Sequence, residues 1–136
     1  MFYCEIISGL WVGDIDIMLH KKFIKENNIN IIINCTQQIA FPEVDVKKIR
    51  IPLSDRLEND IDLLKQNKDK ILEFIFNQLD VDNILICCYD GLNISPFIVA
   101  IFLIKYGDIK KEDVRTIIRT KNNSITLDYD NSLFDL

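Results

Sequence analysis

The residues best suited to chemistry lie in one short stretch, Leu85 to Pro96. An apolar segment runs directly into Cys88, a loop containing Gly91 follows, and Ser95-Pro96 opens a second apolar segment. Such a loop can bind an oxyanion, because backbone N–H groups turn inward and the positive end of a helix lies behind them. That positive end would also lower the pKa of Cys88 and favour its thiolate. The stretch therefore predicts an anion-binding loop with a nucleophilic sulfur at its base.

The predicted phosphate-binding loop comprises Tyr89, Asp90, Gly91, Leu92, Asn93 and Ile94. Gly91 permits a bend that side chains would block. We expect Asp90 to point into solvent, because an inward carboxylate would repel phosphate. Asn93 either braces the loop through side-chain hydrogen bonds or tolerates a left-handed backbone. Ser95 is expected to cap the following helix, whose first turn suits Pro96.

The loop contains no arginine or lysine, and Ile94 occupies the place expected for a phosphate-binding cation. Its side chain either points into the anion pocket or folds into the core. Arg50 and Lys105 are other basic residues that a fold might bring to the loop. Cys88 itself also has a simpler interpretation, as a buried structural thiol at the end of a strand.

The loop resembles the signature of the cysteine-dependent dual-specificity protein phosphatases, which reads His-Cys, five variable residues, Arg, then Ser or Thr. On this resemblance Cys88 is the nucleophile, Gly91 the usual loop glycine, and Ser95 the hydroxyl residue that helps the thiolate leave. Three upstream segments also resemble the family, so that the likeness covers roughly residues 7–120: Gly9-Leu10-Trp11-Val12-Gly13, Ile32-Ile33-Asn34-Cys35-Thr36 and Ile51-Pro52-Leu53-Ser54-Asp55. The last of these implies Asp55 as the general acid, whereas the simpler interpretation of Asp55 is a turn residue.

Two positions depart from the family pattern: Cys87 stands where the family has histidine, and Ile94 where it has arginine. The resemblance therefore implies a pseudophosphatase that acts by protein binding or scaffolding. The alternative is an active phosphatase that uses Cys88 as nucleophile and Asp55 as general acid. A third interpretation, thiol redox chemistry between Cys87 and Cys88, suffers from the strain of a disulfide between adjacent cysteines.

Composition limits the class of partner. The chain of 136 residues has a formal net charge of −5 and no basic stripe, which argues against nucleic acid or an anionic membrane as partner. No apolar run reaches transmembrane length, and Met1 to Glu5 lacks the basic start of a signal peptide. We expect a protein partner, such as a phosphoprotein. Small viral members of the family dimerise, so the resemblance leaves a homodimer open.

The four cysteines and the single histidine, His20, show no metal-ligand spacing, so we expect neither a metal nor a cofactor. A chain with this share of apolar residues has little need of disulfides. We therefore expect reduced thiols and a cytoplasmic location.

Strand and helix patterns alternate along the chain. Strands are expected at 4–7, 10–12, 29–35, 47–52 and 83–87. Helices are expected from Asp14 or Asp16 to about Asn27, from about 60 to 79, from 95 to 106, and from 110 to about 120 with Val114, Ile117 and Ile118 facing inward; the tail at 127–136 suits a short closing helix. This order predicts one α/β domain over residues 1–136, with a mostly parallel central sheet and helices on both faces.

Overall fold

A five-stranded sheet in the order β1-β2-β5-β3-β4 forms the centre of the computed structural model, which describes residues 1–136. β1 is antiparallel to β2, and all other neighbouring strands are parallel, which confirms the mostly parallel sheet. The strands are β1 (Tyr3–Ile7), β2 (Leu10–Gly13), β3 (Ile29–Asn34), β4 (Lys47–Arg50) and β5 (Asn83–Cys87).

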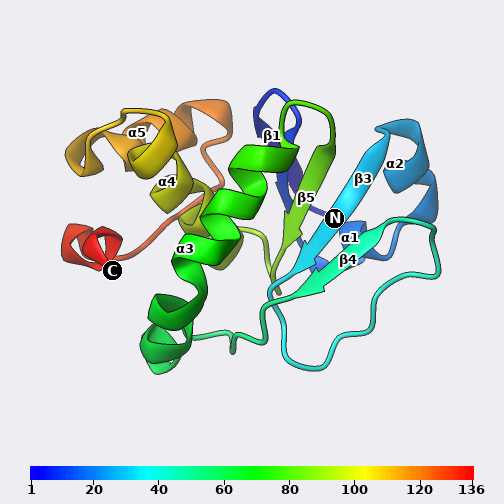
Figure 1. Cartoon of the computed structure of the whole chain (residues 1–136), viewed down its shortest axis with the longest axis horizontal. Coiled ribbons are helices and arrows are strands. Elements are labelled where there is room, and N and C mark those ends of the chain that lie inside the picture. The colour runs from blue at the N-terminus through cyan, green and yellow to red at the C-terminus, as the bar shows by residue number, and fades with distance from the viewer.

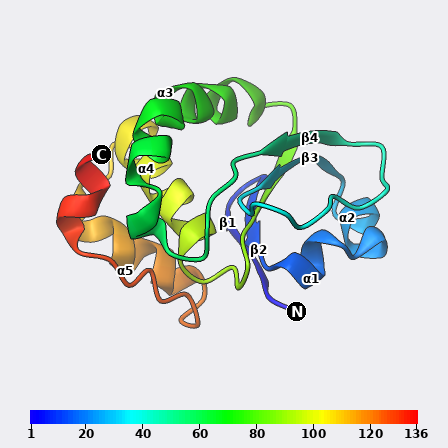
Figure 2. The same cartoon turned by 90° about the horizontal axis from the view of Figure 1, so that it is seen from below.

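Helices cover both faces of this sheet, as expected for an α/β fold (Figures 1 and 2). One face carries two short helices, α1 (Ile15–Met18) and α2 (Lys21–Glu26). The other carries α3 (Ile61–Gln78), α4 (Ile94–Tyr106) and α5 (Lys111–Lys121), with the 3-10 helices η1 (Leu57–Asn59) and η2 (Asn131–Asp135). No helix is both long and apolar enough to cross a membrane.

The core is divided by the sheet into two clusters, and β5 contributes to both. Ile84 and Ile86 belong to the larger cluster, under α3 to α5, whereas Leu85 and Cys87 belong to the smaller cluster, under α1 and α2. Alternation of side chains along a strand produces this division. α4 lies at the heart of the larger cluster, because every residue from Ile94 to Leu103 is buried. The connection from β5 to α4 is therefore held between two buried elements.

The segment after β2 forms two helices instead of the single one that its apolar spacing predicts. Asp14 caps α1 as expected, since its carboxylate accepts a hydrogen bond from the N–H of Ile17 at 2.9 Å. The helix then breaks at His20, whose backbone is extended and whose Nδ1 accepts from the N–H of Phe23 at 3.1 Å. His20 thus caps α2.

The C-terminal part of the chain differs from expectation in one residue. Val114 and Ile118 of α5 are fully buried as predicted, but Ile117 is 37% exposed. One face of α5 packs on the core, and Ile117 lies at the margin of that face. The predicted closing helix is confirmed as η2, whose Phe134 is buried in the core and stacks on Phe97 of α4.

Candidate active site

The loop from Cys88 to Ser95 joins β5 to α4 at the carboxyl end of the parallel strands (Figure 1). The N–H of Cys88 extends the pairing of β5 by donating to the carbonyl of Gly13 at 3.2 Å. Gly91 adopts a φ of +75°, and a Cβ there would lie 2.8 Å from the backbone carbon of Gly13. The predicted need for glycine at position 91 is therefore confirmed, since both the backbone conformation and the close approach exclude a side chain.

The loop curls around the sulfur of Cys88, a residue that is only 1% exposed. The N–H groups of Gly91 and Ser95 donate to this sulfur at 3.2 and 3.3 Å. The hydroxyl of Ser95 lies 3.2 Å from the same atom. The structure thus brings together Cys88, Gly91 and Ser95 in the arrangement that the sequence predicts.

The N–H of Ser95 at the start of α4 lowers the pKa of Cys88 as expected, but the net shift of this pKa is upward. Burial raises the pKa of this thiol above its ordinary value, and the charge of Asp90 adds to the increase. Hydrogen bonds from Ser95 and Gly91 act in the opposite direction but do not outweigh burial. Burial therefore disfavours the thiolate form of Cys88.

Asp90 is exposed as predicted, but its carboxylate also turns back toward the loop. Its Oδ1 accepts from the N–H of Leu92 at 2.9 Å and lies 3.8 Å from the sulfur of Cys88. The local hydrogen bond to Leu92 holds the carboxylate at the mouth of the loop. A negative charge in this position opposes the binding of an anion.

The side chain of Ile94 folds into the core, which decides between the two placements that the sequence leaves open. It is 3% exposed and belongs to the larger cluster. Ile94 is also the first residue of α4, and Asn93 precedes it as the N-cap. The helix therefore begins one residue earlier than expected, and Ser95 lies within the first turn beside Cys88 instead of capping the helix.

Four amides of the loop remain without a partner in the protein. The N–H groups of Tyr89, Asp90, Asn93 and Ile94 donate no hydrogen bond. Backbone amides of this kind are the groups with which a loop of this shape binds an oxyanion. The frame of an anion site is thus present without a cationic side chain.

A distant segment braces the loop from outside. The Oδ1 of Asn93 accepts from the hydroxyl of Thr126 at 2.5 Å and from the N–H of Asp128 at 3.0 Å. The carbonyl of Leu92 accepts from the N–H groups of Thr126 and Leu127, both at 3.1 Å. Asn93 therefore braces the loop through side-chain hydrogen bonds, which is one of the two roles that the sequence leaves open for it.

The brace is held in turn by Arg115 of α5. Its guanidinium donates to the carbonyls of Leu127 and Tyr129 and to the side chain of Asn131. Burial raises the pKa of the Tyr129 phenol, so this side chain stays neutral beside the site. Sequence reasoning missed Thr126, Tyr129 and Arg115, because no local pattern signals contacts between segments that are twelve or more residues apart.

Asp55 makes no hydrogen bond to the Cys88 loop. It is exposed in the segment after β4 and makes no hydrogen bond or ion pair. The link between the two segments is Tyr89, whose hydroxyl donates to the carbonyl of Leu53 at 3.4 Å and accepts from the N–H of Gln37 at 3.3 Å. The proposed role of Asp55 as general acid stays a prediction.

Neither basic residue considered as a substitute cation donates to the loop. The guanidinium of Arg50 donates to the carbonyls of Thr36 and Ile39, at 3.0 and 2.8 Å. It also lies over the ring of Phe41. The ammonium of Lys105, near the far end of α4, pairs with Asp69 at 3.3 Å.

The cysteines are all free thiols. Cys87 and Cys88 belong to the clusters on opposite faces of the sheet, so their side chains point apart. Burial raises the pKa of both thiols. This geometry disfavours a bond between the two sulfurs.

Comparison with known proteins places this geometry in a family. The family model described as "Dual specificity phosphatase, catalytic domain" matches residues 10–134. Comparison with curated protein sequences gives no match. Among solved structures, human DUSP28 is similar with a TM-score of 0.84 at 12% identity, covering 98% of this chain and 90% of that one.

Two further structures show the same fold. DUSP15 has a TM-score of 0.83 at 19% identity, with 97% of this chain and 83% of that one covered. The human tyrosine phosphatase-like serine/threonine/tyrosine-interacting protein has a TM-score of 0.81 at 17% identity, covering 98% and 93%. These likenesses show the fold, and the family model spans nearly all of the 136 residues. The chain therefore belongs to the dual specificity phosphatase family.

Proposed function

We propose that this chain is a catalytically silent dual specificity phosphatase that acts by binding a protein. The observation that carries the proposal is Ile94, buried in the core at the position of the family arginine. A hydrocarbon side chain offers no donor to a phosphate oxygen or to the charge of the transition state. Losing one preorganised donor costs about 3–4 kcal/mol in rate, and a bidentate guanidinium contributes at least as much. Turnover should therefore fall about a thousandfold or more on this account.

The state of Cys88 supports the same proposal. The thiolate is the nucleophilic form of cysteine, and burial raises the pKa of this thiol. Cys87 replaces the family histidine with a buried thiol whose pKa is raised by burial, so it supplies no positive charge to favour the Cys88 thiolate. The carboxylate of Asp90 adds repulsion toward an incoming phosphate.

The alternative is an active phosphatase with Cys88 as nucleophile, Ser95 assisting the leaving thiolate and Asp55 as general acid. The contact of 3.2 Å between Cys88 and Ser95 favours it, as do the four unpartnered amides of the loop. These features preserve the backbone of the anion-binding loop, but they do not supply the positive charge that the reaction needs.

The deciding experiment is the hydrolysis of a small aryl phosphate by the purified chain, compared with Cys88→Ser. We expect the two proteins to give the same background rate. Turnover in the parent chain that disappears in Cys88→Ser would overturn the proposal and establish the alternative. A phosphorylated peptide assayed in the same way extends the test to a protein-like substrate.

The partner in this proposal is another protein, and a phosphoprotein is the form that the remaining loop amides suit best. We also propose that the chain works in the cytoplasm, which its four free thiols support. Pairing of two copies would be a further binding mode, and sedimentation of the purified chain at several concentrations measures it.

A further inference from the structure

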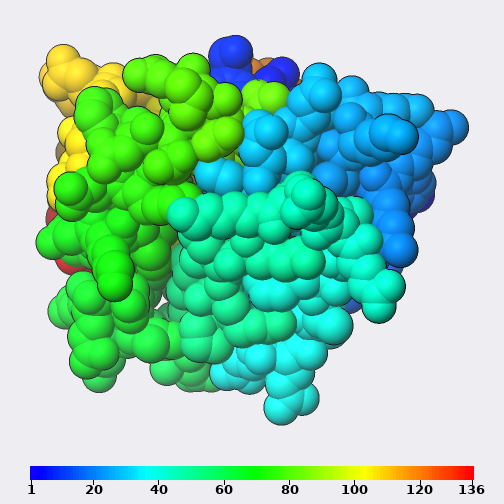
Figure 3. Space-filling view, turned by 45° about the vertical axis from the view of Figure 1, so that its right-hand side comes forward, coloured from blue at the N-terminus to red at the C-terminus, as the bar shows by residue number.

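A groove with a volume of about 480 Å³ lies between helix α3 and the edge strand β4, which we call the α3–β4 groove. In the space-filling view α3 (green) and β4 (blue-green) lie beside each other and the surface is hollowed between them (Figure 3). No residue of the loop 89–95 lines it. The groove is therefore a separate feature from the candidate active site.

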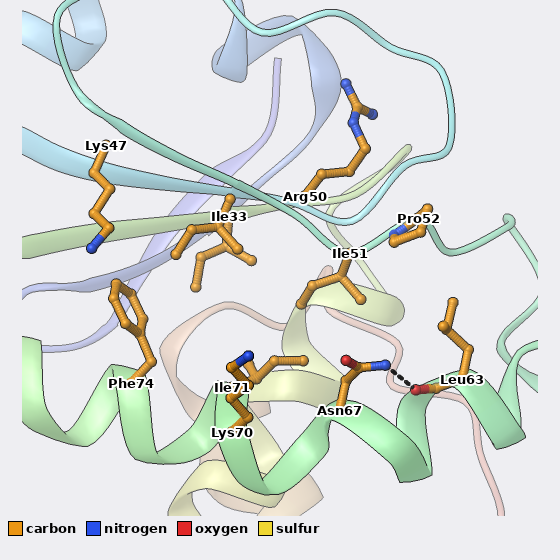
Figure 4. A pocket seen from close by; sticks show the side chains of 11 residues that line it. Ile33, Lys47, Arg50, Ile51, Pro52, Leu63, Asn67, Lys70, Ile71 and Phe74 are labelled. Carbon is orange, nitrogen blue, oxygen red and sulfur yellow. Dashed lines mark hydrogen bonds between the residues drawn. The ribbon is translucent and has the colours of Figure 1, made fainter.

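The walls of the groove are apolar but incompletely covered. Leu63, Ile71 and Phe74 extend from α3 toward β4 (Figure 4). Ile49 of β4 also lines the groove. All four are only partly buried against the larger core cluster. Apolar side chains of a partner would remove this surface from water, which favours binding.

The charges of the groove are of one sign. Its charged lining residues are Lys47, Arg50 and Lys70, and no acidic residue is among them. The ammonium of Lys47 lies 4.9 Å from the centre of the Phe74 ring, across the groove. The guanidinium of Arg50 is engaged by Thr36 and Ile39, so the two lysines remain to meet a ligand. A basic groove on a chain of net charge −5 calls for an acidic occupant.

The backbone of β4 adds a means of attachment. β4 is the last strand of the sheet and pairs on one side only, with β3. The N–H of Ile51 donates inward to the carbonyl of Asn34 at 2.9 Å, so alternation turns the amides of Lys48 and Arg50 toward the free edge. An extended segment that adds there as a strand would direct every second side chain to the α3 side, into the groove.

The geometry points to the α3–β4 groove as the docking site for an extended segment of a partner protein that carries apolar side chains beside Asp or Glu. The segment pairs with the edge of β4, inserts its apolar side chains between Ile49, Ile71 and Phe74, and places its carboxylates near Lys47 and Lys70. This inference rests on the proposed function, since it assigns a surface and a partner chemistry to a chain that acts by binding.

The test is selection of a displayed library of random twelve-residue peptides against the full chain. We expect the selected peptides to combine at least two apolar residues with Asp or Glu. The variant Lys47→Glu/Lys70→Glu should weaken their binding by about tenfold or more, because two attractions become repulsions. The matched control is Lys65→Glu/Lys121→Glu, which makes the same charge change at exposed residues of α3 and α5 that do not line the groove. We expect less than about a twofold effect from the control.

Amide chemical shifts of the labelled chain locate the bound peptide, and thermal melts show that each variant is folded. Shifts confined to β4 and α3 support the inference. It is overturned if no peptide is selected, if both double variants weaken binding equally, or if the shifts fall on the loop 88–95. The inference is also overturned if the chain associates with itself and only the Lys47→Glu/Lys70→Glu variant abolishes this association. The groove would then bind a second copy of the chain. If the chain shows Cys88-dependent turnover and also binds peptides in the groove, the proposal of catalytic silence is wrong. The inference about the groove then stands.

Discussion

At the scale of single residues, residue 94 matters both to the candidate site and to the core. An arginine there would be long enough to leave the start of α4 and reach the loop, whereas Ile94 gains stability by joining the core. The same residue thus removes a charge from the site and adds apolar contact beneath it. The proposed loss of catalysis and the packing of the core thus depend on the same side chain.

The double variant Ile94→Arg/Cys87→His tests whether the rest of the site is intact. We expect hydrolysis of an aryl phosphate at least about tenfold above the parent chain, because the guanidinium restores stabilisation of the transition state. The control is the same pair of substitutions with Cys88→Ser, which should stay at background. A folded variant without recovery would mean that another feature also prevents the reaction, such as the Asp90 carboxylate or the exposed position of Asp55.

The buried thiols predict how stability depends on pH. Burial raises the pKa of Cys35, Cys87 and Cys88 above the ordinary value of 9.0. Well below pH 9.0 these thiols are protonated in both the folded and the unfolded chain, so they do not make the free energy of unfolding depend on pH. Above it the unfolded chain loses these protons before the folded chain does, so the free energy of unfolding falls as pH rises, by at most about 1.4 kcal/mol per pH unit for each thiol.

Urea unfolding at about pH 7.5 and about pH 9.5 measures this loss. The variant Cys35→Val keeps an apolar side chain at a fully buried site and removes one titrating group. We expect its loss of stability between the two pH values to be smaller than that of the parent chain. An equal loss would show that the thiols are not responsible.

At the scale of elements, the sequence predicts those parts of the site whose conformation depends on the residues within the segment itself. Asn83–Cys87 and the helix after it are continuous apolar segments, so the sequence predicts both within one or two residues. Gly91 is predictable because a tight loop requires it. The start of α4 is not, because Ile94 enters the core and draws the first helical turn with it.

Contacts between distant elements lie beyond sequence reasoning. The brace on Leu92 and Asn93 comes from residues 126–128, and the groove depends on how far α3 stands from β4. The fold brings these segments together. The sequence of each segment contains no pattern that indicates which other segment it contacts. The break at His20 also escapes prediction, because an apolar spacing typical of one helix continues across it.

The brace predicts a measurable contribution to stability. Asn93→Ala removes two hydrogen bonds, from the Thr126 hydroxyl and the Asp128 N–H, and should lower the free energy of unfolding by about 1–2 kcal/mol. Asn123→Ala, an exposed residue near the same segment, should change it by less than about 0.5 kcal/mol. Urea unfolding of both variants checks this; equal values would contradict a brace at Asn93.

At the scale of the whole molecule, charge and topology act together. The sheet places the Cys88 loop at one end of the parallel strands and leaves β4 as a free edge. The net charge of −5 surrounds a loop that has no cation of its own, whereas the α3–β4 groove has only basic residues among its charged lining. The field of the molecule therefore repels a small dianion in general, and attraction for acidic groups is concentrated at the groove.

This distribution of charge predicts how inorganic anions bind. We expect calorimetry with vanadate or phosphate to give no dissociation constant in the low micromolar range, because the loop amides lack a cation beside them. Added salt should leave any weak binding unchanged or strengthen it, since screening reduces the repulsion from the net charge. Ile94→Arg should bind vanadate more tightly and lose affinity as salt is added, because a fixed cation then dominates the field at the loop. Tight, salt-weakened binding by the parent chain would mean that a basic side chain already reaches the anion, and the electrostatic basis of the proposed silence would fail.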